Sequence, residues 1–213
     1  MLGTRLRQAS SGALLPAELG WIGIGFDDSA TATSFDFGDF NMPAGGLAIV
    51  AVVHNRGGGQ NVDGVTIGGG AATVDAFQES SVWAMAIASR LVPAGASNVS
   101  VSISGTGGFN VAVGVWLLQR PALAAVHDSA ATGSGSGSST PTVDVPANGF
   151  VIYAASQNAA DIGWSAATER AEIETDSSPT RYVSFADRSI VPGASGEVET
   201  VSSNTWAIAA SYG

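Results

Sequence analysis

Apolar side chains recur at every second position in several parts of this 213-residue chain. Val99, Val101 and Ile103 alternate with serines, and a similar run of alternate valines covers residues 111–115. Successive side chains of a β-strand point to opposite faces, so this period predicts strands with one buried face. The unbroken apolar run Leu47–Val53 instead predicts a strand covered on both faces. Apart from a short stretch over residues 4–19, no segment has the period of a capped helix, and we expect an all-β fold.

Glycine and proline separate these runs at short intervals. Glycine makes up 28 of the residues, and glycine clusters at 57–59 and 68–70 lie between expected strands. Short strands about ten residues apart with such turns are typical of a β-sandwich or barrel. The strands are expected near residues 22–27, 31–37, 46–54, 62–67, 82–92, 98–104 and 109–118, and then near 122–127, 141–145, 149–157, 164–173, 181–191, 197–202 and 205–212.

The second half of the chain repeats parts of the first half. Pro43–Ala51 matches Pro146–Ala154, and three shorter matches follow at a similar offset of about 100 residues. These shorter matches are Asp28–Ala30 with Asp128–Ala130, Ala71–Thr73 with Ala166–Thr168, and Arg90–Pro93 with Arg188–Pro192. Each half then has the size of a seven-stranded sandwich.

The repeat predicts two tandem β-sandwich copies of jelly-roll or immunoglobulin-like type. We expect the copies to cover residues 21–120 and 121–213, after a short N-terminal arm over residues 1–20. The Gly/Ser-rich stretch 132–139 has the composition of an interdomain linker. Because it aligns with residues 32–39 in the repeat, we interpret it as a loop inside the second copy.

Several classes of site are excluded by residues that the chain lacks. It has no cysteine, so disulfides, thiolate nucleophiles and cysteine-based zinc sites are impossible. All eight basic residues are arginine, which excludes a P-loop lysine and a Schiff-base lysine. We therefore expect no cofactor. The net charge of −10 and pI near 4.3 argue against binding to nucleic acid, whose phosphates would be repelled.

No segment has the composition of a membrane span. The longest uncharged stretch, residues 91–119, contains many Gly, Ser, Asn and Pro residues, whereas a spanning helix needs about 20 mostly apolar ones. Arg5 and Arg7 precede a short apolar stretch, as in a signal peptide, but serines and a glycine break it and Pro16 follows. We expect no membrane insertion.

Each group of residues that could take part in catalysis or metal binding also has a structural explanation. His54 aligns with Gln157 in the repeat and His127 with Phe26, so neither position requires an imidazole. Glu172 and Glu174 lie two apart on an expected strand, which places them on one solvated face. The oxygen-rich stretch 36–41 lacks the twelve-residue pattern of a calcium loop. No G-x-S-x-G motif occurs. We expect that the protein is not an enzyme.

Two groups of residues remain as candidate binding sites. Trp164 lies beside an expected turn and is the best candidate for contact with a glycan, whereas Trp116 and Trp206 are expected in the core. The N-terminal arm combines spaced leucines with the only close pair of basic residues. It is either an unanchored terminus or a segment that orders on a partner, whose candidate contact residues are Leu2, Arg5, Leu6, Arg7, Leu14 and Leu15.

The turn and strand motifs resemble those of β-rich appendage proteins. Pro43–Leu47, Val65–Gly69 and Val92–Gly95 before Val99–Val101 are similar to segments of tail fibres, head fibres and spikes of tailed phages and gene transfer agents. The resemblance covers residues 40–118 and, more faintly, 146–212. It implies a homo-oligomeric, non-enzymatic virion component that binds other virion structural proteins or a host cell-surface polysaccharide. The alternative is a secreted bacterial carbohydrate-binding or adhesion module.

Overall fold

The computed structural model describes residues 17–29, 32–55, 59–105, 110–121, 125–133, 138–158, 161–177, 180–190, 197–198 and 205–213. Within these ranges every regular element is a β-strand, so the all-β prediction is confirmed. No helix in the described part of the chain is long and apolar enough to cross a membrane.

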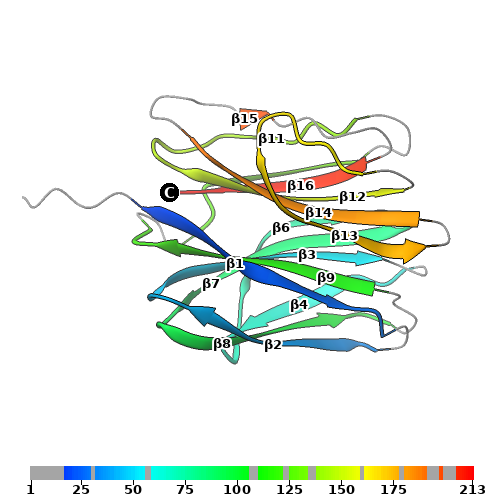
Figure 1. The fold of residues 1–213 in the computed structure, drawn as a ribbon, viewed down its shortest axis with the longest axis horizontal. Coiled ribbons are helices and arrows are strands. Elements are labelled where there is room, and N and C mark those ends of the chain that lie inside the picture. Colours follow the sequence, from blue (N-terminus) through cyan, green and yellow to red (C-terminus); the bar gives the residue numbers. More distant parts are fainter. Residues whose placement is uncertain are drawn as a thin grey trace, which may run out of the picture.

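Three antiparallel sheets are stacked face to face (Figure 1), and we name them lower, central and upper by their place in that view. The lower sheet has the order β2 (Ser34–Met42), β8 (Gly95–Ile103), β4 (Val62–Ile67) and β5 (Gly70–Ala71). The central sheet has the order β1 (Glu18–Asp27), β9 (Asn110–Gln119), β3 (Gly46–Asn55), β7 (Trp83–Val92) and β6 (Thr73–Glu79). The upper sheet has the order β10 (Asp128–Gly133), β16 (Thr205–Tyr212), β12 (Phe150–Asn158), β14 (Thr180–Ser189) and β13 (Thr168–Ser177). A small pair, β11 (Thr142–Val143) and β15 (Glu197–Val198), lies beyond the upper sheet.

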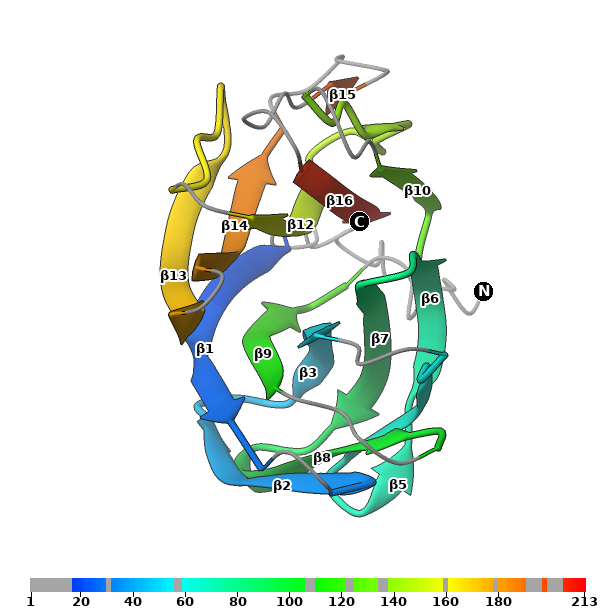
Figure 2. The ribbon, with the colours of Figure 1, turned by 90° about the vertical axis from the view of Figure 1, so that its right-hand side faces the viewer.

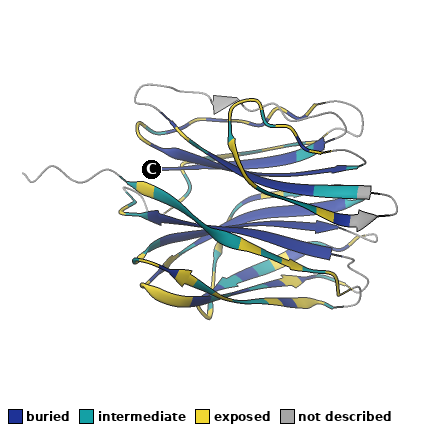
Figure 3. Cartoon of the chain, viewed as in Figure 1, coloured by how far each residue is buried: buried dark blue, intermediate teal, exposed yellow. Residues whose placement is uncertain are grey.

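The three inner strands of the central sheet, β3, β7 and β9, are buried on both faces, and Figure 3 shows the central sheet with long dark blue stretches. Alternate residues of β3, such as Ala48 and Val50, pack in one apolar cluster with the lower sheet. The residues between them, such as Leu47 and Ile49, pack in a second cluster with the upper sheet. All of Leu47–Val53 is at most 1% exposed, which confirms the strand covered on both faces.

Strands with a period of two bury one face. In β8, Val99, Val101 and Ile103 are buried, whereas the serines between them are partly or fully exposed. The residues for which the alternation predicts burial are all at most 3% exposed: Ile49, Val101, Ile103, Val113, Ile152 and Ile208. The alternation therefore predicts the buried face correctly.

The central and upper sheets have the same strand order. Reading along each sheet, β1, β9, β3, β7 and β6 correspond to β10, β16, β12, β14 and β13. The pairing registers also correspond: Ala48 lies opposite Arg90 in the central sheet, and Val151 lies opposite Arg188 in the upper one. The sequence matches that begin at Pro43, Ala71 and Arg90 in the first half therefore fall at equivalent places.

One of the four sequence matches is structurally accidental. Asp28 follows the end of β1, whereas Asp128 begins β10. The strand expected near 122–127 accordingly starts later, at Asp128. The N-terminal boundary of the expected first copy also changes. The arm was expected to reach residue 20, but Glu18–Gly20 belong to β1.

The two equivalent sheets pack against each other through equivalent faces. Leu47, Ile49 and Ala51 of β3 meet the counterparts of the same positions in β12, Phe150, Ile152 and Ala154, within one apolar cluster. Strand β3 contacts β12 at the centre, and β6 contacts β10 at one edge. Figure 2 shows β1 on the same side as β13 and β6 on the same side as β10, which is the arrangement of a face-to-face pair related by an approximate two-fold axis.

The partner sheets of the two halves differ greatly in size. The lower sheet has strands of nine, nine, six and two residues, whereas β11 and β15 have two residues each. The five-stranded sheets of the two halves therefore share one strand order, whereas the sheets that cover them differ among the described residues, and two tandem sandwich copies stay a prediction.

Candidate functional site

A carboxylate at the interface of the two equivalent sheets receives three hydrogen bonds. Asp187 of β14 accepts from Arg170 of β13 through Nε at 2.6 Å and Nη2 at 2.9 Å, and from the indole Nε1 of Trp116 at 2.7 Å. The Asp187 side chain is only 4% exposed. Its hydrogen bonds raise the pKa of Arg170 further above its ordinary value. Because Trp116 lies in the central sheet, this group fastens the two sheets together.

A second polar contact crosses the same interface. The Tyr212 hydroxyl donates to Oδ2 of Asp75 at 2.7 Å. Burial raises the pKa of Asp75, and burial beside this carboxylate raises the pKa of Tyr212 as well. Asp75 and Arg170 occupy equivalent β-bulges, since the register shifts between Val74 and Ala76 in β6 and between Glu169 and Ala171 in β13. Both bulged side chains take part in contacts that join the sheets.

The third contact lies at the far end of the interface. The Arg181 guanidinium lies over the Trp83 ring, 5.8 Å from its centroid, and donates to Asn55 Oδ1. Nearby, Asn110 of the central sheet donates through Nδ2 to the carbonyl of Thr175 in the upper sheet. These groups also have structural partners and do not face an open cleft.

The two histidines lie in different surroundings. His54 is fully buried, with Nδ1 3.1 Å from the carbonyl oxygen of Asn110. The backbone N–H of His127 donates to Ser211 beside β10. Within the described residues, no group of three His, Asp or Glu side chains is placed to hold a metal ion. In the oxygen-rich stretch, Asp36 accepts from Asn98 and the Gly38 N–H, which lowers its pKa.

The acidic run of β13 is less uniformly solvated than expected. Glu174 is exposed, but Glu172 is half-buried and accepts the N–H of Ile162 at 2.6 Å. Burial raises the pKa of both Glu169 and Glu172. The hydrogen bond from Ile162 ties the segment after β12 to the upper sheet, which is a structural role.

Trp164 is half-buried against the upper sheet. Its Nε1 donates to Ser184 Oγ at 2.8 Å, and its ring lies 5.6 Å from that of Tyr153 at an angle of 49°. Contact between a glycan and the rest of this ring stays a prediction. The other predicted contact residues lie outside the described residues: Leu2, Arg5, Leu6, Arg7, Leu14 and Leu15.

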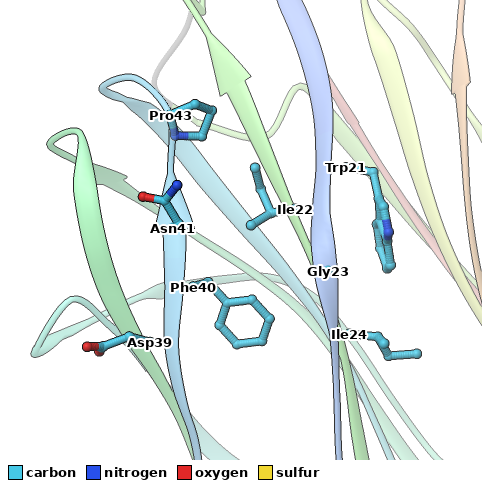
Figure 4. Close-up of a pocket in the computed structure, with 8 residues that line it drawn as sticks. All are labelled: Trp21, Ile22, Gly23, Ile24, Asp39, Phe40, Asn41 and Pro43. Carbon is cyan, nitrogen blue, oxygen red and sulfur yellow. The ribbon is translucent and has the colours of Figure 1, made fainter.

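An open groove lies between the edge strands β1 and β2 (Figure 4). It has a volume of about 530 Å³, and its lining residues are Trp21, Ile22, Gly23, Ile24, Asp39, Phe40, Asn41 and Pro43. The Phe40 ring lies next to Gly23, where an added Cβ would come within 3.5 Å of the ring. Strand β1 pairs only with β9 and β2 only with β8, so the outer edges of both strands are unpaired.

The groove and its surroundings combine apolar and acidic side chains. Ile24 and Phe26 of β1 are 38% and 41% exposed and belong to the few large apolar residues of the described part with such exposure. Asp36 and Asp39 of β2 are exposed acidic residues nearby. This combination suits an extended peptide with apolar and basic side chains.

The place in the second half that corresponds to this groove lies between β10 and the segment after β11, and hydrogen bonds connect the two sides there. The Asp128 carboxylate of β10 accepts the N–H of Asp144, which follows β11, at 2.8 Å. The Ser211 hydroxyl donates to the Asp144 carbonyl at 2.6 Å. The groove of the first half has no such bridge among the described residues, so the two halves offer different surfaces at equivalent edges.

Comparison of the chain with family models, curated proteins and solved structures finds no match. The groove itself was not predicted from the sequence, and Trp21, Ile24 and Phe40 had no assigned role. No local sequence signal indicates that these residues lie together, because they belong to strands of two different sheets.

Proposed function

We propose that this protein is a non-enzymatic structural component of a phage or phage-like particle. It would act as a tail fibre, head fibre or spike in assembly or in attachment to the host surface. The observation that carries the proposal is the use of the polar groups: Asp75 and Asp187 are engaged in contacts that hold the two sheets together, and His54 contacts the neighbouring strand of its own sheet. The surface left open is an apolar strand edge, which suits attachment rather than catalysis.

We further propose that the chain arose by duplication of one β-sandwich unit. Equal strand order, equal register and the equivalent bulges at Asp75 and Arg170 support this origin. In this proposal the second copy has kept its five-stranded sheet and reduced its partner sheet. The face-to-face contact of the copies then follows from the shared apolar pattern of their inner faces.

Composition supports a role in a permanent assembly. Charged residues make up only 12% of the chain, about half of the usual share of about 25%. Apolar surface on such a protein is commonly hidden in interfaces with other subunits. We therefore propose homo-oligomers and contacts with other virion proteins, with the residues before β1 as the attachment segment.

Incorporation into particles tests this function directly. The full chain should sediment with particles of the organism that encodes it, and a variant lacking residues 1–16 should not. The deletion stops there because Ala17 and Leu19 pack against the apolar cluster between the sheets. An unchanged melting transition of the truncated chain is the control for folding. Absence of the full chain from purified particles would contradict the proposed function.

A secreted carbohydrate-binding or adhesion module is the second candidate, because Trp164 keeps part of its ring exposed. Aromatic rings on a protein surface commonly stack on apolar ligand faces. This function predicts retention of the monomer on a bacterial polysaccharide column and loss of retention in Trp164→Ala. Equal elution of the two proteins would count against it.

A further inference from the structure

We infer that the groove between β1 and β2 receives the N-terminal segment, residues 1–16, of a second copy of this chain. The inference rests on the proposed function in one respect, that this segment is used for attachment. It adds the place where the segment binds and the identity of its partner.

The backbone of the groove offers main-chain hydrogen bonds. Strands β1 and β2 both have an unpaired edge on the same side of the molecule. An exposed strand edge is a template for an added strand, because its N–H and C=O groups alternate at the spacing of another extended chain.

The side chains of the segment and the groove are complementary. Arg5 and Arg7 are the only charged side chains in residues 1–17, whereas the chain as a whole carries −10. Asp39 lines the groove and is exposed, and Asp36 lies on the same strand. Arginine forks bind carboxylates with strong, oriented hydrogen bonds. Ile22 and Phe40 lie between β1 and β2 (Figure 4) and offer the leucines of the segment an apolar surface, whereas Ile24 projects from the other side of β1, where it is 38% exposed.

The start of β1 favours a neighbouring copy over the segment of the same chain. Ala17 and Leu19 are packed against the interface cluster, so the chain enters β1 in a fixed direction. Because β1 begins at Glu18, a tight hairpin with the same chain would place Pro16 and Ala17 in the turn, with proline as the first turn residue. The favoured two-residue turns require a positive φ, which proline cannot adopt. Sixteen extended residues span about 50 Å, which is long enough to reach another molecule.

The second half of the chain shows why the segment is expected at only one of the two corresponding edges. The equivalent edge there is bridged through Asp128, Asp144 and Ser211. Each chain therefore has one groove and one segment. Mutual exchange of segments closes a dimer, whereas one-way exchange builds a ring or filament.

The mass of the purified protein in solution is the first test. We expect the full chain to be oligomeric by light scattering and the chain lacking residues 1–16 to be monomeric. Ile24→Glu should weaken association at least tenfold. The matched control is Val74→Glu on β6, an equally exposed apolar residue at the other edge of the central sheet, which should leave association unchanged. A monomeric full chain at about 100 μM would overturn the inference.

Cross-linking identifies the site even if a substitution disturbs folding. Because the chain has no cysteine, Leu6→Cys in one tagged copy and Asn41→Cys in another can be joined selectively by a short bismaleimide. We expect a cross-linked heterodimer, and at most a tenth of that yield when Asp63→Cys on β4 replaces Asn41→Cys. Equal yields, or a doubly substituted chain that links only within itself at every concentration, would refute exchange. Particle incorporation is measured separately, so either result leaves the proposed function to its own test.

Discussion

Residues 17–121 and residues 125–213 each contribute a five-stranded sheet with one strand order, yet they differ in how its outer face is covered. In the first half, β2 and β8 are nine residues long and build a four-stranded partner sheet. In the second half, the corresponding cover contains β11 and β15, of two residues each. The inner faces cover each other, so the same apolar pattern serves both. The outer faces have no such mutual contact, and they are covered differently in the two halves.

The largest effect should come from removing the ring that links the two sheets. Trp116→Ala should lower the free energy of unfolding by about 3–5 kcal/mol, because it opens a cavity and leaves Asp187 with one donor fewer. Trp116→Phe keeps most of the packing and should cost less. Chemical denaturation measures both, and Trp164→Ala provides a half-buried control. A loss no larger than that of the control would mean that the interface is not the main stabilising contact.

Truncation of buried side chains should show that the inner faces of the two five-stranded sheets contribute similarly to stability and that their outer faces do not. Ile49→Ala and Ile152→Ala both remove a buried side chain from the shared cluster and should each cost about 2–5 kcal/mol, with similar values. Val50, which follows Ile49, and Val151, which precedes Ile152, are not equivalent positions, but each is a buried valine on the outer face of its sheet, where it can be truncated to alanine. We expect Val50→Ala to lower the free energy of unfolding more than Val151→Ala. Val50 is covered by the four-stranded lower sheet, which can move less into the cavity that the substitution leaves. Unequal costs at the two isoleucines would argue against equivalent halves.

The smallest effect concerns pH. Burial raises the pKa of Asp75 in the folded protein above the ordinary value of 3.8, so the folded state binds this proton more tightly than the unfolded chain. Its contribution to stability is therefore present at low pH and is lost as pH rises through the raised pKa. Asp75→Asn should flatten this slope, and the change in stability should be smaller than those of the truncations above because Asp75 is only half-buried.

Asp36→Asn is the opposite control for the pH measurement. Hydrogen bonds lower the pKa of Asp36, so its contribution is present at higher pH and is lost as pH falls through the lowered value. Thermal unfolding between pH 2 and 7 should show slope changes of opposite sign in the two variants, with that of Asp36→Asn below the ordinary pKa of 3.8 and that of Asp75→Asn above it. Changes of the same sign would contradict the surroundings described for Asp75.

Apolar periodicity was sufficient to predict most strands and the buried residues, because burial of one face is a local property of a strand. It failed at β6, where the bulge at Asp75 interrupts the alternation. Its counterpart β13 was expected from the second half, although the same kind of bulge occurs there. The repeat also misplaced Asp128, because short matches in an alanine-rich chain arise by chance.

The groove was beyond prediction for a different reason. Which strand becomes an edge depends on the order of strands in the sheet, and that order results from contacts between residues far apart in sequence. Trp21 and Phe40 are nineteen positions apart on strands of different sheets, and nothing local indicates that they line one groove. The bridge between Asp128 and Asp144 in the second half is equally non-local.

The mutual cover of the two sheets has a consequence during synthesis. The first half can complete both of its sheets once β9 has left the ribosome, but the face that carries Leu47, Ile49 and Trp116 stays uncovered until β16 is made. At about 5–20 residues per second, this delay lasts roughly 5–20 s. Throughout that interval the nascent chain exposes this apolar face to other nascent chains on the same polysome. Chaperone demand should therefore peak late in translation rather than when the first strands emerge.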